Sequence, residues 1–230
     1  MSTQMSTHKK LWDAFADQHK IQDTWVPLFS TSSSGVVNTK KIGITNVRNI
    51  LCRSDQMESL IISECAKLVY DWTIDTHDYD GLLYIMAFED IDGIVPLYIG
   101  KAESYGKKAG NLSVNIKGVD RDKSKFARWG DNYAYHIGDL SAAVLHGHDP
   151  KHVEQKYLSW ATELFTNAPN DYPVLKRPTY FWAKAWNSNE TGPWQDFGAT
   201  RLTFLEYLLI GLTSSAFGER LLNREGHNRK

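Results

Sequence analysis

Hydrophobic side chains recur at every third or fourth position in several stretches of this chain, as they do on the buried face of a helix. The clearest case is 54–71, where Ser54 precedes the apolar positions and is placed to cap the helix. Residues 123–130 are expected to form a short helix, and 27–42, which is rich in Ser, Thr and Gly, a loop. Further helices are predicted over 9–19, 139–146, 151–167 and 200–212.

Three shorter apolar runs have the length and composition of β-strands. Residues 81–88 and 94–99 flank an acidic turn at 89–93, whose Asp-Gly pair is typical of a tight hairpin. A third strand is predicted over 179–186, where aromatic residues are frequent. The chain is therefore expected to combine helices and strands in an α/β (α+β) fold.

The composition of the 230 residues fits a globular chain with a substantial core, since 42 % of them are hydrophobic. That length suits one domain with an extension, or two small domains. No apolar stretch approaches 18 residues and no apolar signal segment opens the chain, so we expect a cytoplasmic protein without a membrane span. The two cysteines form no CxxC pair, which argues against a disulfide framework or a thiolate zinc site.

The net charge of −1 excludes a chain that is basic throughout, but it hides an uneven distribution. Residues 101–130 carry eight lysines and arginines against three acidic residues, and they follow directly after the predicted hairpin. Such a patch would bind phosphate groups, whereas a solvated lysine-rich loop is the plain structural interpretation. The candidate DNA-binding residues are Lys101, Lys107, Lys108, Lys117, Arg121 and Lys125.

One carboxylate stands inside an apolar helix. Glu206 is flanked by Phe204, Leu205, Tyr207 and Leu208. A carboxylate in such a run must be paired, neutralised or bound to a cation, unless it faces solvent on the wet side of the helix. Both interpretations fit the periodicity alone.

Two further motifs invite metal or nucleotide chemistry. His146, His148 and His152 could supply nitrogen ligands to zinc, but they lie where a polar junction between two helices is expected. The segment from Gly100 to Lys108 departs from a phosphate-binding P-loop, because five residues separate its glycines and no apolar helix follows it. We therefore favour neither reading.

The predicted hairpin carries a tyrosine on each strand. The first strand contains Leu82-Leu83-Tyr84 and the second begins Tyr98-Ile99-Gly100. This pair of motifs resembles the GIY-YIG nuclease family, whose first motif normally reads Gly-Ile-Tyr and whose second motif is matched in full here. Without the family pattern, two core tyrosines on paired strands would be the simpler interpretation.

Further residues of the family pattern follow in the same order over roughly residues 81–225. They are an arginine, a glutamate inside an apolar helix, and an asparagine soon after it, here Arg128, Glu206 and Asn223. The long spacing between Tyr98 and Arg128, and an apparent insertion near 131–177, are more similar to the restriction-enzyme branch of the family.

The resemblance implies a GIY-YIG-like fold with a small three-stranded antiparallel sheet flanked by helices. The strands would be 81–88, 94–99 and 179–186. Residues 1–80 would form a helical N-terminal extension that reads DNA or mediates dimerisation. Residues 81–230 would form the nuclease domain, with the insertion near 131–177 before the third strand.

The resemblance also assigns roles to single residues. One of Tyr84 and Tyr98 would take a proton from the attacking water, and the other would orient water or phosphate. Arg128 would clamp a phosphate oxygen. Glu206 would hold Mg²⁺, with Mn²⁺ as the other candidate. Asn223 would orient a ligand or water, unless it is a turn residue.

His136 adds a sixth candidate, because some restriction-type members of the family carry a histidine beyond the arginine. It would act as a base or as a phosphate contact, and its plain alternative is an ordinary polar histidine.

These expectations converge on a metal-dependent endonuclease that cleaves double-stranded DNA, as a sequence-specific type II restriction enzyme. Cleavage of both strands at a symmetric site calls for a homodimer. A cognate methyltransferase would act separately on the same site. The alternatives are a structure-selective repair or recombination nuclease, and a catalytically silent nucleic-acid-binding protein on the same scaffold.

Overall fold

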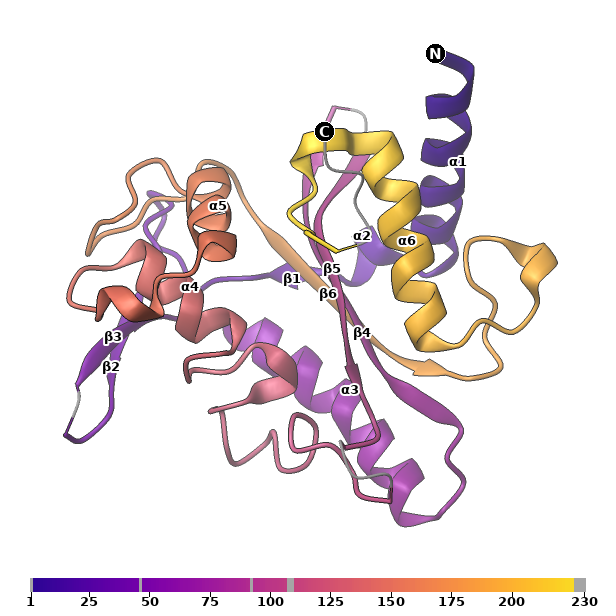
Figure 1. Ribbon diagram of the computed structural model, residues 1–230, viewed down its shortest axis with the longest axis horizontal. Helices are drawn as coiled ribbons and strands as arrows, with labels where there is room; N and C mark the ends of the chain where they lie inside the picture. The colour runs from indigo at the N-terminus through magenta and orange to yellow at the C-terminus, as the bar shows by residue number, and fades with distance from the viewer. Residues whose placement is uncertain (1, 46, 92, 107–109, 226–230) are drawn as a thin grey trace.

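The computed structural model describes residues 2–45, 47–91, 93–106 and 110–225, and it shows a mixed α/β fold (Figure 1). The helices are α1 (Ser2–Gln18), α2 (Ile21–Thr24), α3 (Asp55–Thr73), α4 (His136–Val144), α5 (Gln155–Leu164) and α6 (Leu202–Phe217). The strands are β1 (Val26–Pro27), β2 (Thr39–Ile42), β3 (Arg48–Leu51), β4 (Tyr79–Asp90), β5 (Gly93–Glu103) and β6 (Tyr180–Asn187). The expected fold class is thus confirmed, and each predicted strand is present.

The main sheet is antiparallel and has the strand order β1-β6-β4-β5. The long β4–β5 hairpin places Tyr84 opposite Gly100 and Met86 opposite Tyr98. The prediction of three strands was one strand short, because Val26 pairs with Phe181 and so adds β1 beyond β6. A two-residue strand that contains a proline has no periodic signal in the sequence. β2 and β3 form a separate two-stranded sheet, so the predicted loop 27–42 is partly strand.

Alternate residues of β4 face two different cores, as the pleat of a strand requires. Leu82, Tyr84 and Met86 belong to the core that α3, α4 and α5 cover. Leu83 and Ile85 belong to the core beneath α1 and α6. Figure 1 shows α1 and α6 together beside one side of the sheet, with α4 and α5 on the other. The sheet is therefore buried on both faces over its central strand.

Residues 1–80 contribute elements to both layers. Trp12 and Phe15 of α1 are fully buried in the core beneath α6, and the Trp12 indole donates to the Ile94 carbonyl at 2.9 Å. α3 packs against β6. Its first turn is capped as predicted, since the Ser54 hydroxyl accepts a hydrogen bond from the Met57 amide at 3.0 Å.

The predicted helix over 123–130 is wrong. The segment contains only the short turn η1 (Phe126–Arg128), and all three of its residues have positive φ, at 33°, 49° and 75°. Long-range contacts impose this left-handed backbone, because the Ala127 amide donates to the Asn115 carbonyl at 2.7 Å. In the part of the chain that the structure describes, no helix has the length and apolar character needed to cross a membrane.

Candidate active site

The two hairpin tyrosines face the same side of the sheet. Their rings are stacked with centroids 6.3 Å apart. Tyr84 is buried and Tyr98 is half-buried. The Tyr84 phenol lies across Gly100 on the neighbouring strand, and a Cβ added at that glycine would come within 2.6 Å of the ring. The glycine of the second motif is therefore required by the tyrosine of the first.

Replacing Gly100 with Ala is expected to displace the Tyr84 phenol and to reduce stability by about 1–3 kcal/mol, because the new methyl group overpacks a buried site. Urea unfolding would measure the loss. Gly211→Ala in α6 is the matched control, since an added Cβ there meets nothing within 4 Å and alanine favours the helix by about 0.5–1 kcal/mol. Equal stability of the two variants would contradict the placement of Tyr84.

His136, the first residue of α4, is buried between two phenols. Its Nε2 lies 3.2 Å from the Tyr84 hydroxyl, and its Nδ1 lies 2.9 Å from the Tyr157 hydroxyl of α5. Burial, helped by Lys156 and Arg128, holds the pKa of the imidazole well below its usual range. A neutral imidazole has one donor and one acceptor nitrogen, so it can accept from one phenol while it donates to the other.

Arg128 ends the left-handed turn η1. Positive φ at a residue other than glycine costs about 1–3 kcal/mol and persists only where surrounding contacts enforce it. Here the Arg53 guanidinium supplies one such contact, donating to the Trp129 carbonyl at 2.8 Å. The Arg128 guanidinium lies 5.3 Å from the centre of the Tyr135 ring. The turn thus fixes Arg128 in place by its backbone.

Glu206 lies on α6, beside the edge strand β5. It lines a hollow of about 860 Å³ together with Arg128. The other charged residues of the hollow are Lys101, Glu103 and Glu225. Burial raises the Glu206 pKa to about 7, and Glu103 and Glu225 add to the effect. Lys101, whose amine is 3.9 Å from the carboxylate, opposes it.

Asn223 is held by the backbone of β5. Its side-chain amide donates to the Ile99 carbonyl at 2.7 Å, and its carbonyl oxygen accepts from the Ile99 amide at 2.9 Å. The Leu222 amide donates to the Leu97 carbonyl at 2.7 Å. The two anchored residues of β5, Leu97 and Ile99, flank Tyr98. Asn223 thus fixes the strand that carries the second motif, and an additional role in orienting a ligand stays a prediction.

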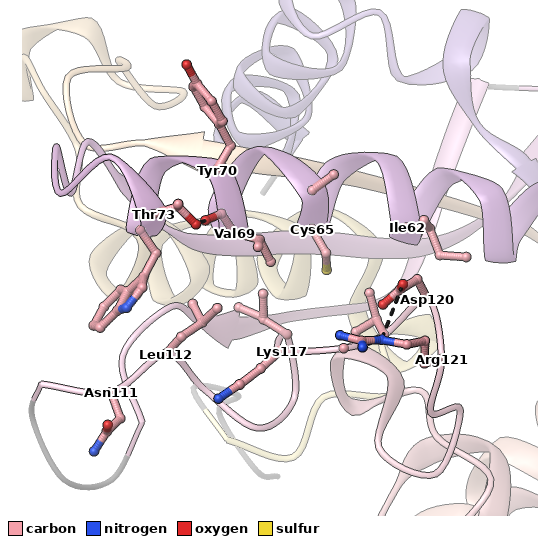
Figure 2. Close-up of a pocket in the computed structure, with 15 residues that line it drawn as sticks. Ile62, Cys65, Val69, Tyr70, Thr73, Asn111, Leu112, Lys117, Asp120 and Arg121 are labelled. Atoms are coloured by element: carbon pink, nitrogen blue, oxygen red, sulfur yellow. Dashed lines mark hydrogen bonds and ion pairs between the residues drawn. The ribbon is translucent and has the colours of Figure 1, made fainter.

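The structure separates the predicted DNA-binding lysines and arginines. Lys101 lines the hollow, where its amine pairs with Glu103 and donates to the Thr203 hydroxyl at 2.8 Å. Lys117 and Arg121 instead line a second hollow of about 720 Å³ between α3 and residues 111–121 (Figure 2). Lys125 is half-buried beside η1. Lys107 and Lys108 lie outside the described residues.

At the second hollow, the positive charge of Arg121 is partly offset by a neighbouring carboxylate. Arg121 pairs with the adjacent Asp120 at 3.6 Å, and its side chain is 85 % exposed. Such a pair on the surface adds little to stability. The basic stretch therefore does not form one continuous wall of the hollow that contains Glu206.

The residues around Glu206 include carboxylates, which are the kind of ligand that a magnesium ion prefers. Mg²⁺ is usually held by one or two carboxylates and completes its shell with water and phosphate oxygens. Glu206 is a carboxylate that burial makes hard to ionise, so a cation beside it would stabilise its charged form. Within the described ranges, no group of three or more His, Cys, Asp or Glu side chains is arranged to bind a metal.

Two of the histidines at the possible zinc spacing, His148 and His152, have other partners. His148 contacts the Tyr133 hydroxyl at 2.9 Å and the Asn49 carbonyl at 2.8 Å. The His152 ring stacks on Tyr133 with centroids 3.6 Å apart. These contacts join the loop after α4 to the β2–β3 hairpin, which is a structural use.

Sequence reasoning missed two residues beside the tyrosines, Lys156 and Tyr157 of α5. In the sequence, Tyr157 is one of the apolar positions of the helix predicted over 151–167, and its partner His136 is 21 residues away.

Comparisons with protein-family models, with curated proteins and with solved structures found no match to this chain.

Proposed function

We propose that this chain is a metal-dependent endonuclease that hydrolyses phosphodiester bonds in double-stranded DNA. One observation carries the proposal: the two tyrosines stack on one face of the β4–β5 hairpin, His136 lies 3.2 Å from the Tyr84 hydroxyl, and Arg128 and Glu206 lie near enough to change the pKa of both phenols. Burial raises the Tyr98 pKa, the Glu206 carboxylate raises it further, and Arg128 opposes both. Burial likewise raises the Tyr84 pKa, with smaller effects from Tyr98, Arg128 and Glu206.

The tyrosines can take part in proton transfer only with help. A phenol with a raised pKa stays protonated near neutral pH, because the phenolate is disfavoured where it is buried, so almost no phenolate is present to act as a base. Tyr84 can instead accept a proton from water while it passes its own proton to Nε2 of the neutral His136. In this scheme the phenol carries the proton from water to His136, and because the pKa of that imidazole is held well below its usual range, the imidazolium would be short-lived.

Arg128 and Glu206 would together offset the negative charge on the phosphate, Arg128 directly and Glu206 through a bound metal ion. The guanidinium can donate two parallel hydrogen bonds to phosphate oxygens and offset the charge that grows during hydrolysis. Glu206 would hold Mg²⁺ or Mn²⁺, which when bound supplies charge relief on the phosphate and on the leaving oxygen. A homodimer that recognises a symmetric site as a type II restriction enzyme is the form of this activity we favour. A cognate methyltransferase would protect that site.

The test is incubation of the protein with supercoiled plasmid DNA and Mg²⁺ or Mn²⁺, with EDTA as the control. We expect discrete fragments that require the metal. DNA that is bound but never cut, with either metal, would contradict the proposal and favour a silent binding protein. Preferential cutting of branched over linear duplexes of the same sequence would favour a structure-selective nuclease instead.

A further inference from the structure

Lys156, the second residue of α5, reaches into the aromatic cluster around the candidate active site. Its amine donates to the Tyr98 hydroxyl at 3.3 Å. The same nitrogen lies 4.7 Å from the ring centre of Tyr98, 5.3 Å from Tyr157 and 5.2 Å from Trp160. The side chain is half-buried. Its ammonium group is thus packed among three aromatic rings beside the phenol of the second motif.

The surroundings of Lys156 disfavour its charged form, because the side chain is half-buried and none of the described carboxylates is paired with its amine. Among the described residues, no carboxylate oxygen lies within 4.0 Å of its amine. Burial and the neighbouring Arg128 lower its pKa to about 8, against smaller opposite effects of Glu154, Asp139 and Glu225. It also lies in the first turn of a helix, where the partial positive charge of the helix disfavours a cation.

Lys156 contacts the Tyr98 phenol, and Arg128 lies near enough to lower the pKa of both Tyr98 and Lys156. Arg128 comes from η1 and Lys156 from α5, and each lowers the pKa of the buried His136 between them. Mutual repulsion of this kind is relieved when an anion binds to both groups. Tyr98 has an aromatic contact with His136, with centroids 5.2 Å apart, so the imidazole lies beside the same phenol that Lys156 contacts.

We propose that Lys156 and Arg128 together form an oxyanion subsite beside Tyr98, which binds the phosphate group of a phosphodiester. The subsite rests on the proposed function for the identity of that phosphate, although binding of the oxyanion itself does not require cleavage. Lys156 would supply a point charge with movable donors, and Arg128 would supply a planar fork.

Binding of inorganic phosphate, measured by calorimetry without metal or DNA, tests the subsite directly. Lys156→Met is expected to weaken phosphate binding about tenfold or more, since a charge-assisted hydrogen bond is lost. Lys156→Arg should retain most of the affinity. Lys151→Met is the matched control, because Lys151 precedes the same helix but its side chain is 69 % exposed and pairs with Asp149. Lys151→Met should bind phosphate with the affinity of the wild type.

A second measurement is made on the wild-type protein, and a variant is used only to assign the signal. In wild-type protein with ¹³C-labelled lysine, the Cε signal of Lys156 should shift when phosphate is added and stay in place when chloride is added at equal ionic strength. Lys156→Arg identifies that signal by its loss. An unmoved signal, or equal phosphate binding by wild type and Lys156→Met, would overturn the proposal.

The same subsite should contribute to binding of a DNA duplex in EDTA, measured by fluorescence anisotropy. A duplex that binds wild type more tightly than Lys156→Met supports a phosphodiester ligand, whereas an effect on free phosphate alone would overturn that part of the proposal. Phosphate binding through Lys156 in a protein that never cuts plasmid DNA would refute the proposed nuclease and leave the subsite standing.

Discussion

Glu206→Gln should abolish metal-dependent DNA cleavage, with a loss of about 10³-fold or more in rate while DNA binding is retained. The substitution keeps the size of the side chain and removes the only negative charge that α6 brings to the hollow shared with Arg128. Losing one electrostatic contact to a transition state already costs about 10²–10³ in rate, and here the expected metal ligand is lost as well. A plasmid nicking assay with Mg²⁺ measures the effect.

The matched control is Glu219→Gln, at an exposed glutamate just beyond α6. It should cut as fast as the wild type. Cleavage by Glu206→Gln at the wild-type rate would show that the reaction takes place elsewhere on the molecule.

The pH dependence of stability supplies a second readout of the same variant. Burial raises the Glu206 pKa from 4.5 to about 7, so between these values the folded chain keeps a proton that the unfolded chain has released. Stability due to this group is therefore lost as pH rises from about 4.5 to 7, by at most about 3 kcal/mol. Glu206→Gln should melt higher than the wild type at pH 8 and equally at pH 4. Mg²⁺ should reduce the difference in melting temperature between Glu206→Gln and the wild type at pH 8.

Removing the Arg53 guanidinium should cause the largest loss of stability of any single change considered. Its side chain is 1 % exposed and pairs with Asp131 and Glu58. The guanidinium also lies 4.7 Å from the Phe126 ring and donates to the Trp129 carbonyl. Arg53→Met leaves the Asp131 carboxylate buried without its main partner, and loss of one member of a buried pair costs about 3–5 kcal/mol.

Urea unfolding of Arg53→Met measures that loss, and Arg201→Met is its control. Arg201 forms a comparable pair with Asp80, but its side chain is 71 % exposed, so about 1 kcal/mol or less is expected. If the two variants were equally stable, Arg53 could not be a buried anchor of the turn that carries Arg128.

The parts of the fold that the sequence predicts well are those set by local patterns. The hairpin follows from two short apolar runs and an Asp-Gly turn, and α3 from its apolar period and its serine cap. The turn η1 could not be predicted, because its backbone is dictated by Arg53, whose contact with Trp129 spans 76 residues. Local helix propensity cannot foresee a long-range contact of that kind.

The same distinction between local patterns and long-range contacts applies to the residues of the candidate site. Tyr84, Tyr98, Arg128 and Glu206 were proposed from short motifs in the expected order. The structure places both tyrosines on one face of the hairpin, with Arg128 and Glu206 near enough to change the pKa of each phenol. Lys156 was overlooked because in the sequence it is an ordinary polar position of a predicted helix. Its significance depends on Tyr98, which lies 58 residues earlier.

The contacts that anchor Asn223 also determine how the sheet can associate. Over Leu97–Ile99 the outer margin of β5 has its ladder groups occupied by the backbone of Leu222 and the side chain of Asn223. The opposite margin is β1, only two residues long and ending in Pro27, which has no amide hydrogen. Strand addition by a second copy is therefore blocked at Leu97–Ile99 and finds little backbone to pair with at β1. Two copies that met at these positions would have to associate through helices or loops.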